Sequence, residues 1–262
     1  MNIDLHNHTK LCNHAIGECY EYVESAIKNG INIFGFACHA PMEFDKKYRM
    51  SVNEIDSYIY EIRALGEKYR DKISVKVGFE VDYIYKKEYL IEKKVLESDV
   101  DYLIGSVHFL NNWGFDNEEF LSEYNKIDIN DAWKQYLQSI IAMAESRLFD
   151  IVGHFDLFKI FNNKPSFSLQ KDIYNTLEAI KDNDMVLEIN TAGIRKPICE
   201  IYPSRDILEL AYKLEIPITF SSDAHSPSQV GFKKDFAISL AKDIGFKEVV
   251  SFSLHKREVY KI

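Results

Sequence analysis

Short apolar runs alternate with amphipathic stretches along most of the chain. The apolar runs predict strands at residues 1–5, 31–38, 73–81, 102–107, 151–153, 185–190 and 216–221. Apolar side chains spaced three and four residues apart predict helices at residues 17–29 and 51–68. Residues 86–97 are expected to form a charged helix, and further helices are expected at residues 131–147, 169–181, 204–214 and 232–244. Such regular alternation indicates an α/β fold with a parallel sheet, and so many units in one compact length favour a closed barrel over an open sheet.

One segment interrupts the alternation. Residues 109–129 are long and mixed in character, so we expect a lid or a substrate-facing excursion there rather than another barrel unit. The residues after 244 are expected to form a short tail. Because no linker, low-complexity tract or repeat divides the chain, residues 1–262 are predicted to form a single domain.

Composition narrows the class of protein. A chain of 262 residues has the usual size of one α/β barrel, and 46% hydrophobic with 28% charged residues is typical of a soluble globular protein. No segment has the pattern of a secretion signal or the apolar length of a membrane span, so we expect a cytoplasmic protein. The net charge of −9 and the absence of a Lys/Arg block argue against nucleic acid or an acidic membrane surface as the main partner.

The four cysteines have no spacing typical of a disulfide framework or a zinc ribbon. Cys12, Cys19, Cys38 and Cys199 include no Cys-x-x-Cys pair, so we expect reduced thiols. Cys12 and Cys38 lie near histidines in the sequence, but a small buried apolar role is the expected one for both.

Histidines gather at the predicted strand ends. In the opening Asp4-Leu5-His6-Asn7-His8, the two histidines are two residues apart and point to one side of the first strand. Of the eight histidines, only His255 is away from such an end; the others are His6, His8, His14, His39, His108, His154 and His225. A lone histidine is more often a surface or hydrogen-bonded core residue. These seven histidines share a position at the strand ends, which is where a barrel enzyme carries its catalytic residues. Their shared position predicts a common metal site.

Two acids at matching strand ends, Glu80 and Asp223, bring the set of possible ligands to nine. A closed mononuclear zinc site uses only four, so we expect two or three divalent ions, with Glu80 bridging a pair. Imidazole and carboxylate without thiolate suit Zn, Mn or Fe, and the sequence does not choose among them. Two ions about 3.5 to 4 Å apart activate a bridging water and clamp a phosphoryl group. Metal-assisted hydrolysis is therefore the predicted class of reaction.

These residues resemble the successive motifs of a known family. The motifs are Asp4-Leu-His-Asn-His8, the isolated His14 and His39, Gly78-Phe-Glu80, Gly105-Ser-Val-His108, Gly153-His154 and Ser222-Asp-Ala-His225. In order and spacing they resemble the polymerase-and-histidinol-phosphatase (PHP) family, and most of all the histidinol-phosphate phosphatases of bacterial histidine biosynthesis. The resemblance implies a distorted seven-stranded (β/α) barrel of the TIM-like kind with a trinuclear metal site.

The resemblance also implies roles for individual residues. One ion would be held by His6, His8, Glu80 and Asp223, a second by Glu80, His108 and His154, and a third by His14, His39 and His225. A metal-bridging hydroxide would attack the phosphorus of L-histidinol phosphate and release L-histidinol and phosphate. Asp223 would carry a proton to the departing alkoxide, and Arg195, in the loop after the sixth strand, would bind the substrate phosphate.

Arg195 also fits a phosphate site on its own chemistry. Its planar guanidinium matches two phosphate oxygens, and Gly193 lets the loop turn. The alternative is a solvated arginine or one paired with a helix acid, and solvation is expected for Lys196. A selective pocket needs an acid or a carbonyl to bind the amine of the substrate and an aromatic or polar wall beside its imidazole. Candidates on suitable loops are Asp82, Tyr83, Trp113, Asp116, Glu118, Glu119, Asp156 and Phe158.

Three other interpretations stay open. The same ligands could serve phosphotyrosine or another small phosphomonoester. Metal-dependent amidohydrolases also open with His-x-His and end with a strand-end Asp, but they commonly use a lysine where this chain offers Glu80. A non-catalytic metal-binding or regulatory domain is the third, and it would have little use for open metal sites beside an arginine directed at phosphate. The sequence does not indicate the oligomeric state.

Overall fold

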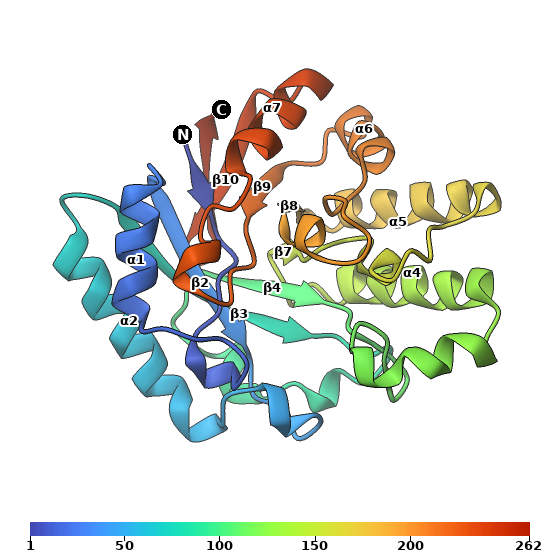
Figure 1. Ribbon diagram of the computed structural model, residues 1–262, viewed down its shortest axis with the longest axis horizontal. Coiled ribbons are helices and arrows are strands. Elements are labelled where there is room, and N and C mark those ends of the chain that lie inside the picture. The colour runs from blue at the N-terminus through green and yellow to red at the C-terminus, as the bar shows by residue number, and fades with distance from the viewer.

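The computed structural model describes residues 1–262, and seven parallel strands organise it (Figure 1). In sheet order they are β1 Ile3–Asp4, β2 Ile33–His39, β3 Ser74–Asp82, β4 Tyr102–Ser106, β7 Ile151–Val152, β8 Val186–Asn190 and β9 Ile218–Ser221. Each strand pairs with the next in parallel, for example with Ala37 of β2 opposite Gly78 of β3.

The two outer strands of this order meet, so the sheet curls into a barrel. Leu5 N–H donates to the Phe220 carbonyl over 3.0 Å, and His8 N–H donates to the Ala224 carbonyl over 2.9 Å. The join lies just beyond the carboxyl ends of β1 and β9, where Asn7 and Ala224 form a parallel bridge. The predicted α/β barrel with seven strands is confirmed.

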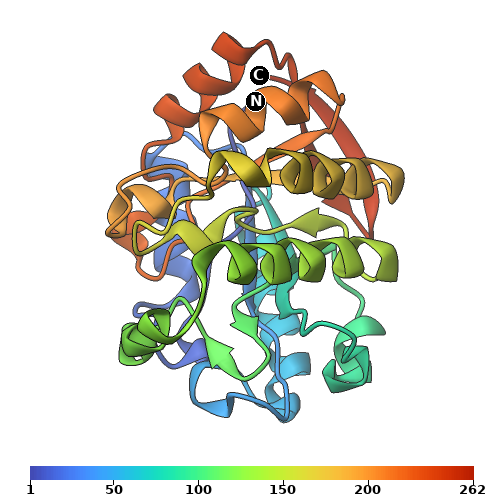
Figure 2. The ribbon, with the colours of Figure 1, turned by 90° about the vertical axis from the view of Figure 1, so that its right-hand side faces the viewer.

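Helices cover the outside of the barrel and bury one face each (Figure 1 and Figure 2). They are α1 Cys19–Lys28, α2 Ile55–Tyr69, α4 Ile129–Ser146, α5 Gln170–Asp182, α6 Arg205–Lys213 and α7 Lys234–Ile244. On α1 the buried side chains include Tyr22, Val23 and Ala26, whereas Tyr20 is exposed. Ser204 occupies the N-cap position of α6 as expected, although its hydroxyl makes no capping hydrogen bond. No helix combines the length and the apolar character needed to cross a membrane.

The predicted helix at residues 86–97 is wrong. The chain turns at Lys86, whose φ of 55° is in the left-handed region, and only a 3₁₀ turn Glu88–Leu90 and the four-residue α3 Lys93–Leu96 follow. Ile91 between them bridges to Met42 instead. Few apolar residues recur here at helical spacing, so a long helix would have no continuous face to bury.

The predicted short tail is also wrong, because residues after α7 form an antiparallel hairpin. Its strands are β10 Glu248–Ser253 and β11 Lys256–Lys261. Leu254 and His255 form the two-residue turn, with φ of 49° and 62°, as a tight hairpin of this kind requires. The turn binds Asp101, directly before β4, since His255 N–H donates to the Asp101 carbonyl over 2.8 Å. The hairpin therefore lies at the amino ends of the barrel strands, opposite to the histidines.

The segment 109–129 lies at the carboxyl ends of the strands. It contains the small hairpin of β5 Phe109–Leu110 and β6 Trp113–Gly114, followed by the 3₁₀ helix Glu118–Lys126. Phe109, Asp116 and Phe120 line the main pocket of the molecule. The expected substrate-facing excursion is therefore confirmed in its position.

Candidate metal centre

Glu80 lies at the centre of the histidine cluster. It is almost the last residue of β3 and only 1% exposed. One carboxylate oxygen, Oε2, lies 2.9 Å from Nδ1 of His39, 3.3 Å from Nε2 of His6 and 3.6 Å from Nε2 of His8. Three rings from the ends of β1 and β2 thus converge on one oxygen.

The second oxygen of Glu80 faces a different pair of histidines. Oε1 lies 2.9 Å from Nε2 of His154 and 3.5 Å from Nε2 of His108. These two histidines follow β7 and β4, and the backbone of His154 has a φ of 20°. The carboxylate therefore separates two groups of imidazoles, and within each of the sets His6–His8–Glu80 and Glu80–His108–His154 the ligand-type atoms lie within 4.8 Å of one another.

Asp223 closes the first group from the opposite side. It comes two residues after β9 in a left-handed backbone conformation, with a φ of 51°. Its Oδ1 lies 3.1 Å from Nε2 of His8 and 3.5 Å from Nδ1 of His225. The Asn190 amide donates to Oδ2 over 3.2 Å and holds the carboxylate toward the histidines.

The outer histidines lie at the rim of the cluster. His14 follows the left-handed Asn13 and faces His225, with 3.0 Å between their Nε2 atoms. The third predicted set is only partly assembled: ligand atoms of His39 lie within 4.8 Å of those of His8 and His225, whereas His14 groups with His225 and Cys12. His39 points its Nδ1 at Glu80 rather than at His14. All nine predicted residues nevertheless lie in one cluster.

The charges of the cluster are strongly coupled. Burial disfavours charge on His6, yet the Glu188 and Glu80 carboxylates raise its pKa well above the usual value. Against the same burial, Asp82 and Glu80 raise the pKa of His108 to about 10. Burial wins at His39, whose pKa is lowered to about 4. The positive charge on the imidazoles therefore neutralises the carboxylates only in part.

This donor set fits divalent cations. Nε2 of His6 and Nδ1 of His39 are buried without a hydrogen-bond partner, although both lie near Glu80. Buried polar atoms are rarely left without partners, so unpaired ring nitrogens beside ionised carboxylates match the requirements of metal ligands. The charges of the neighbouring histidines outweigh burial and hold the pKa of Glu80 well below its usual range, which keeps it ionised.

A second layer of acids holds the rings in place, and sequence reasoning missed its main member. Glu188 is fully buried in β8 and its Oε1 lies 2.7 Å from Nδ1 of His6, while Oε2 accepts the His154 N–H over 2.7 Å. Asp82 lies 2.6 Å from Nδ1 of His108 and forms a 2.6 Å ion pair with Arg49. Carboxylates behind imidazoles fix the ring orientation in metal sites.

Arg195 lies at the edge of the same cluster, at the end of the 3₁₀ helix Ala192–Arg195 that follows β8. Its Nη2 donates to the carbonyls of Ser222 and Asp223, each over 2.9 Å, while Nη1 is buried without a partner. Gly193 is needed because a side chain there would meet the Glu200 carbonyl at 2.1 Å. The guanidinium thus has one fixed nitrogen and one that is free to bind an anion.

These groups open into one pocket of about 680 Å³. Eight of the nine predicted residues line it, all but His6: His8, His14, His39, Glu80, His108, His154, Asp223 and His225. Arg195 and the acids of segment 109–129 form its walls. The pocket therefore joins the metal-type ligands, a cationic anion-binding group and an acidic wall.

Comparison with known proteins gives a consistent result. The sequence matches the PHP domain family over residues 4–192. A probable histidinol-phosphatase of Deinococcus radiodurans is 37% identical over 251 residues, which cover 94% of this chain and 95% of that protein. The histidinol-phosphatase of Bacillus subtilis is 31% identical and covers 87% of this chain and 95% of its own length.

A solved structure matches the fold over almost the whole length. It is histidinol phosphate phosphatase from Lactococcus lactis in complex with zinc, L-histidinol and phosphate, with a TM-score of 0.86, 24% identity and coverage of 98% of each chain. At this identity the match supports the fold of the barrel.

Proposed function

The chain belongs to the PHP domain family, and from that premise we propose that it is a metal-dependent phosphomonoesterase that hydrolyses L-histidinol phosphate to L-histidinol and phosphate. One observation carries the proposal. The two oxygens of Glu80 face two separate groups of imidazoles, and the free Nη1 of Arg195 lines the same pocket. A site of this kind suits a phosphoryl group placed between paired cations and a guanidinium.

The proposed ligands divide around Glu80. One ion would be held by His6, His8, Glu80 and Asp223, and a second by Glu80, His108 and His154, in agreement with the two groups of converging atoms. A third would use His225 with His14 and His39 at the rim. Ions held by these residues would lower the pKa of a bound water molecule and stabilise charge on the phosphoryl oxygens. Zn, Mn and Fe all suit these donors.

Arg195 would bind and orient the phosphate. Its Nη2 is held by two backbone carbonyls on the loop after β9, so the guanidinium plane is fixed before substrate arrives. Burial lowers the pKa of Arg195, but an arginine stays protonated at any working pH. The free Nη1 can then donate to a phosphate oxygen at little further cost in side-chain entropy.

Asp223 would carry the proton to the leaving alkoxide. Despite its burial, the charges of His6, His8 and His225 hold the pKa of Asp223 well below its usual range, so it is a carboxylate at rest. It must therefore first accept the proton that the attacking water gives up, and then deliver it to the departing oxygen.

An acidic group in the pocket would recognise the cationic end of the substrate. Most of the acids considered from sequence already have partners: Asp82 pairs with Arg49, Asp156 with Lys159 and Glu119 with Lys47. Asp116, in the segment that covers the pocket, forms no ion pair, and its main cationic neighbour is His108. Burial raises the pKa of Asp116, and a bound amine would favour its ionised form. We therefore assign the substrate amine to Asp116.

Phosphate release from L-histidinol phosphate, phosphotyrosine and p-nitrophenyl phosphate tests both parts of the proposal. The wild type should favour histidinol phosphate. Asp116→Asn should lower kcat/KM for that substrate about tenfold or more, because a charged hydrogen bond is lost, and leave p-nitrophenyl phosphate unaffected. Glu118→Gln, also on the pocket wall, is the matched control.

The possible outcomes separate the alternatives. Equal turnover of all three substrates would keep the phosphatase chemistry and overturn the assigned substrate. No turnover by fully metal-loaded protein would favour a binding or regulatory domain. An equal loss on every substrate in Asp116→Asn would mean that Asp116 acts on the chemistry rather than on the amine.

A further inference from the structure

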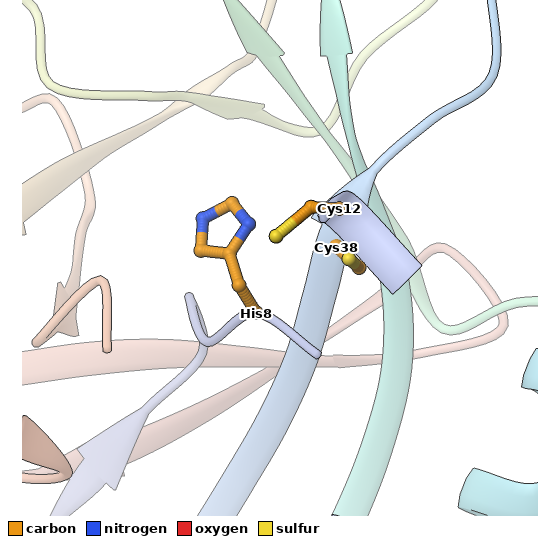
Figure 3. Close-up of side chains that lie close together, drawn as sticks. All are labelled: His8, Cys12 and Cys38. Carbon is orange, nitrogen blue, oxygen red and sulfur yellow. The ribbon is translucent and has the colours of Figure 1, made fainter. Parts of the chain in front are cut away.

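Two cysteines lie directly behind His8, on the side away from Asp223. Cys12 ends the 3₁₀ helix Lys10–Cys12, and Cys38 lies in β2, next to His39. Their sulfurs and a ring nitrogen of His8 lie within 4.8 Å of one another, and all three residues are buried (Figure 3). Neither cysteine is in a disulfide. Two elements distant in sequence thus bring two thiols to one imidazole.

The two ring nitrogens of His8 face different surroundings. Nε2 lies 3.1 Å from Asp223 and belongs to the cluster around Glu80. Nδ1 is buried without a hydrogen-bond partner. Figure 3 shows a nitrogen of this ring turned toward the sulfur of Cys12. His8 therefore has a free donor atom on the side of the thiols, and nothing in the proposed hydrolysis uses it.

Thr9 holds both sulfurs in place. Its backbone N–H and its hydroxyl donate to Sγ of Cys38 over 3.4 and 3.3 Å. Its carbonyl accepts the Cys12 N–H over 3.1 Å, and its hydroxyl oxygen caps the 3₁₀ helix at Leu11 N–H. The thiol of Cys38 in turn donates to the Thr9 carbonyl over 3.6 Å. The pair is therefore organised before any ion arrives.

The thiols can be reached from the main pocket. Cys12 also lies within 4.8 Å of ligand atoms of His14 and His225, which line that pocket. His14 is exposed, so these two histidines form a path of donor atoms from solvent to Cys12. A buried metal site needs such a path.

We propose that Cys12, Cys38 and His8 form a second metal site, which binds a thiophilic d¹⁰ cation such as Cd²⁺ or surplus Zn²⁺. Two thiolates and one imidazole supply three of the four ligands of a tetrahedral site, and the fourth is left to solvent. Binding replaces the two thiol protons, which pass to solvent. Hard ions have little affinity for this set, whereas soft ions prefer it to the carboxylates around Glu80. An ion here would use Nδ1 of His8, whereas the Glu80 cluster uses Nε2 of the same ring.

The test is a titration of metal-free, phosphine-reduced protein with Cd²⁺, followed by the ultraviolet thiolate-to-cadmium charge-transfer absorption. This signal reports sulfur ligation and does not depend on any phosphatase activity. It should saturate with a single ion per chain. Cys12→Ser, Cys38→Ser and His8→Ala should each weaken binding by more than about tenfold.

Matched controls are available within the chain. Cys199→Ser removes an exposed thiol, and His6→Ala removes a histidine that contacts Glu80 and Glu188 and does not group with the two thiols; both should keep the signal. Circular dichroism of each variant checks its fold. If Cys38→Ser does not fold, the result for Cys12→Ser tests the proposal. The proposal is overturned if wild type gives no signal, if the signal persists in folded Cys12→Ser, or if it disappears in Cys199→Ser.

Discussion

The guanidinium of Arg195 makes structural hydrogen bonds and also has a nitrogen without a protein partner. The half that binds the carbonyls of Ser222 and Asp223 is also linked, through Asp223, to His8. The ring of Phe232 lies 5.1 Å from the guanidinium carbon and covers one of its faces. Nη1 has no protein partner and is left for a phosphate, so the contribution of the guanidinium can be measured apart from that of the metals.

Arg195→Ala should retain its metal ions and lose catalytic efficiency. One charged hydrogen bond is worth about 1.5 to 3 kcal/mol, so kcat/KM for phosphate esters should fall about tenfold to a hundredfold. Steady-state phosphate release with elemental analysis of the same samples measures both quantities. Arg205→Ala, which removes an exposed arginine paired with Glu209 and Asp243, should have no effect on kcat/KM. A full-rate Arg195→Ala would mean that the phosphate binds elsewhere.

His255, the one histidine away from the cluster, should affect stability in a pH-dependent way and leave catalysis unchanged. Its Nδ1 lies 2.8 Å from Asp150, and this hydrogen bond raises the pKa of His255. The stabilisation is complete below the unfolded pKa of about 6.5 and is lost as pH rises through the higher folded value. Urea unfolding should therefore find His255→Ala destabilised more at about pH 5.5 than at about pH 9. An equal difference at both pH values would contradict this.

At the residue scale, periodicity found most of the cluster. Most of the predicted ligands lie at or just beyond the end of a strand, whereas His14 lies in the loop that follows the 3₁₀ helix Lys10–Cys12. Glu188 was missed, although an acid two residues before Asn190 in an otherwise apolar strand was a usable signal. Arg49 gave no such signal, because it lies in a loop and reaches Asp82 only through the tertiary fold.

Among the elements, the hairpin β10–β11 has the least obvious role, and it contributes to the site only from a distance. It packs at the amino ends of the strands, and its turn is anchored on Asp101 and Asp150. Asp101 also accepts from Val77 N–H over 2.9 Å and from Nη1 of Arg63 over 2.8 Å, which ties β3 and α2 to the start of β4. The hairpin therefore fixes the strands whose opposite ends carry Glu80 and His108.

Asp101→Ala should destabilise the fold by about 2 kcal/mol, because the buried Val77 N–H and the partly exposed donors of Arg63 and Leu254 lose a charged acceptor. The free energy of unfolding in urea measures this. Asp99→Ala, two residues away and exposed, should stay within about 0.5 kcal/mol of wild type. If the two variants proved equally stable, the hairpin anchor would not contribute as described.

At the element scale, the sequence predicted strands and long helices better than short pieces. Helices with a continuous apolar face, such as α2 and α4, agreed to within a few residues of their ends. Residues 86–97 were expected to form a charged helix, but they lack a continuous apolar face to bury. In the hairpin at residues 248–261, apolar and polar side chains alternate too weakly to distinguish it from a tail. Tertiary contacts decide the structure of both.

In the whole molecule, barrel closure is what assembles the site. His6 and His8 near one end of the chain meet Asp223 and His225 near the other, because β1 and β9 join. Glu80 then receives rings from β1, β2, β4 and β7, so that no single element could form the cluster alone. The barrel and its metal-type cluster could be predicted from strand-end patterns, whereas the division of the outer histidines could not, since it depends on the loop around Asn13.

The most direct test of the account counts metal ions by elemental analysis and measures phosphate release from L-histidinol phosphate on the same samples of wild type and Glu80→Gln. The wild type should hold two to three ions and turn over the substrate. Glu80→Gln should lose ions and more than about a hundredfold in kcat/KM together, because one carboxylate serves both groups of imidazoles. Glu97→Gln, on an exposed ion pair with Lys93, serves as the control. Glu80→Gln with a full metal complement and normal turnover would contradict the central role of Glu80.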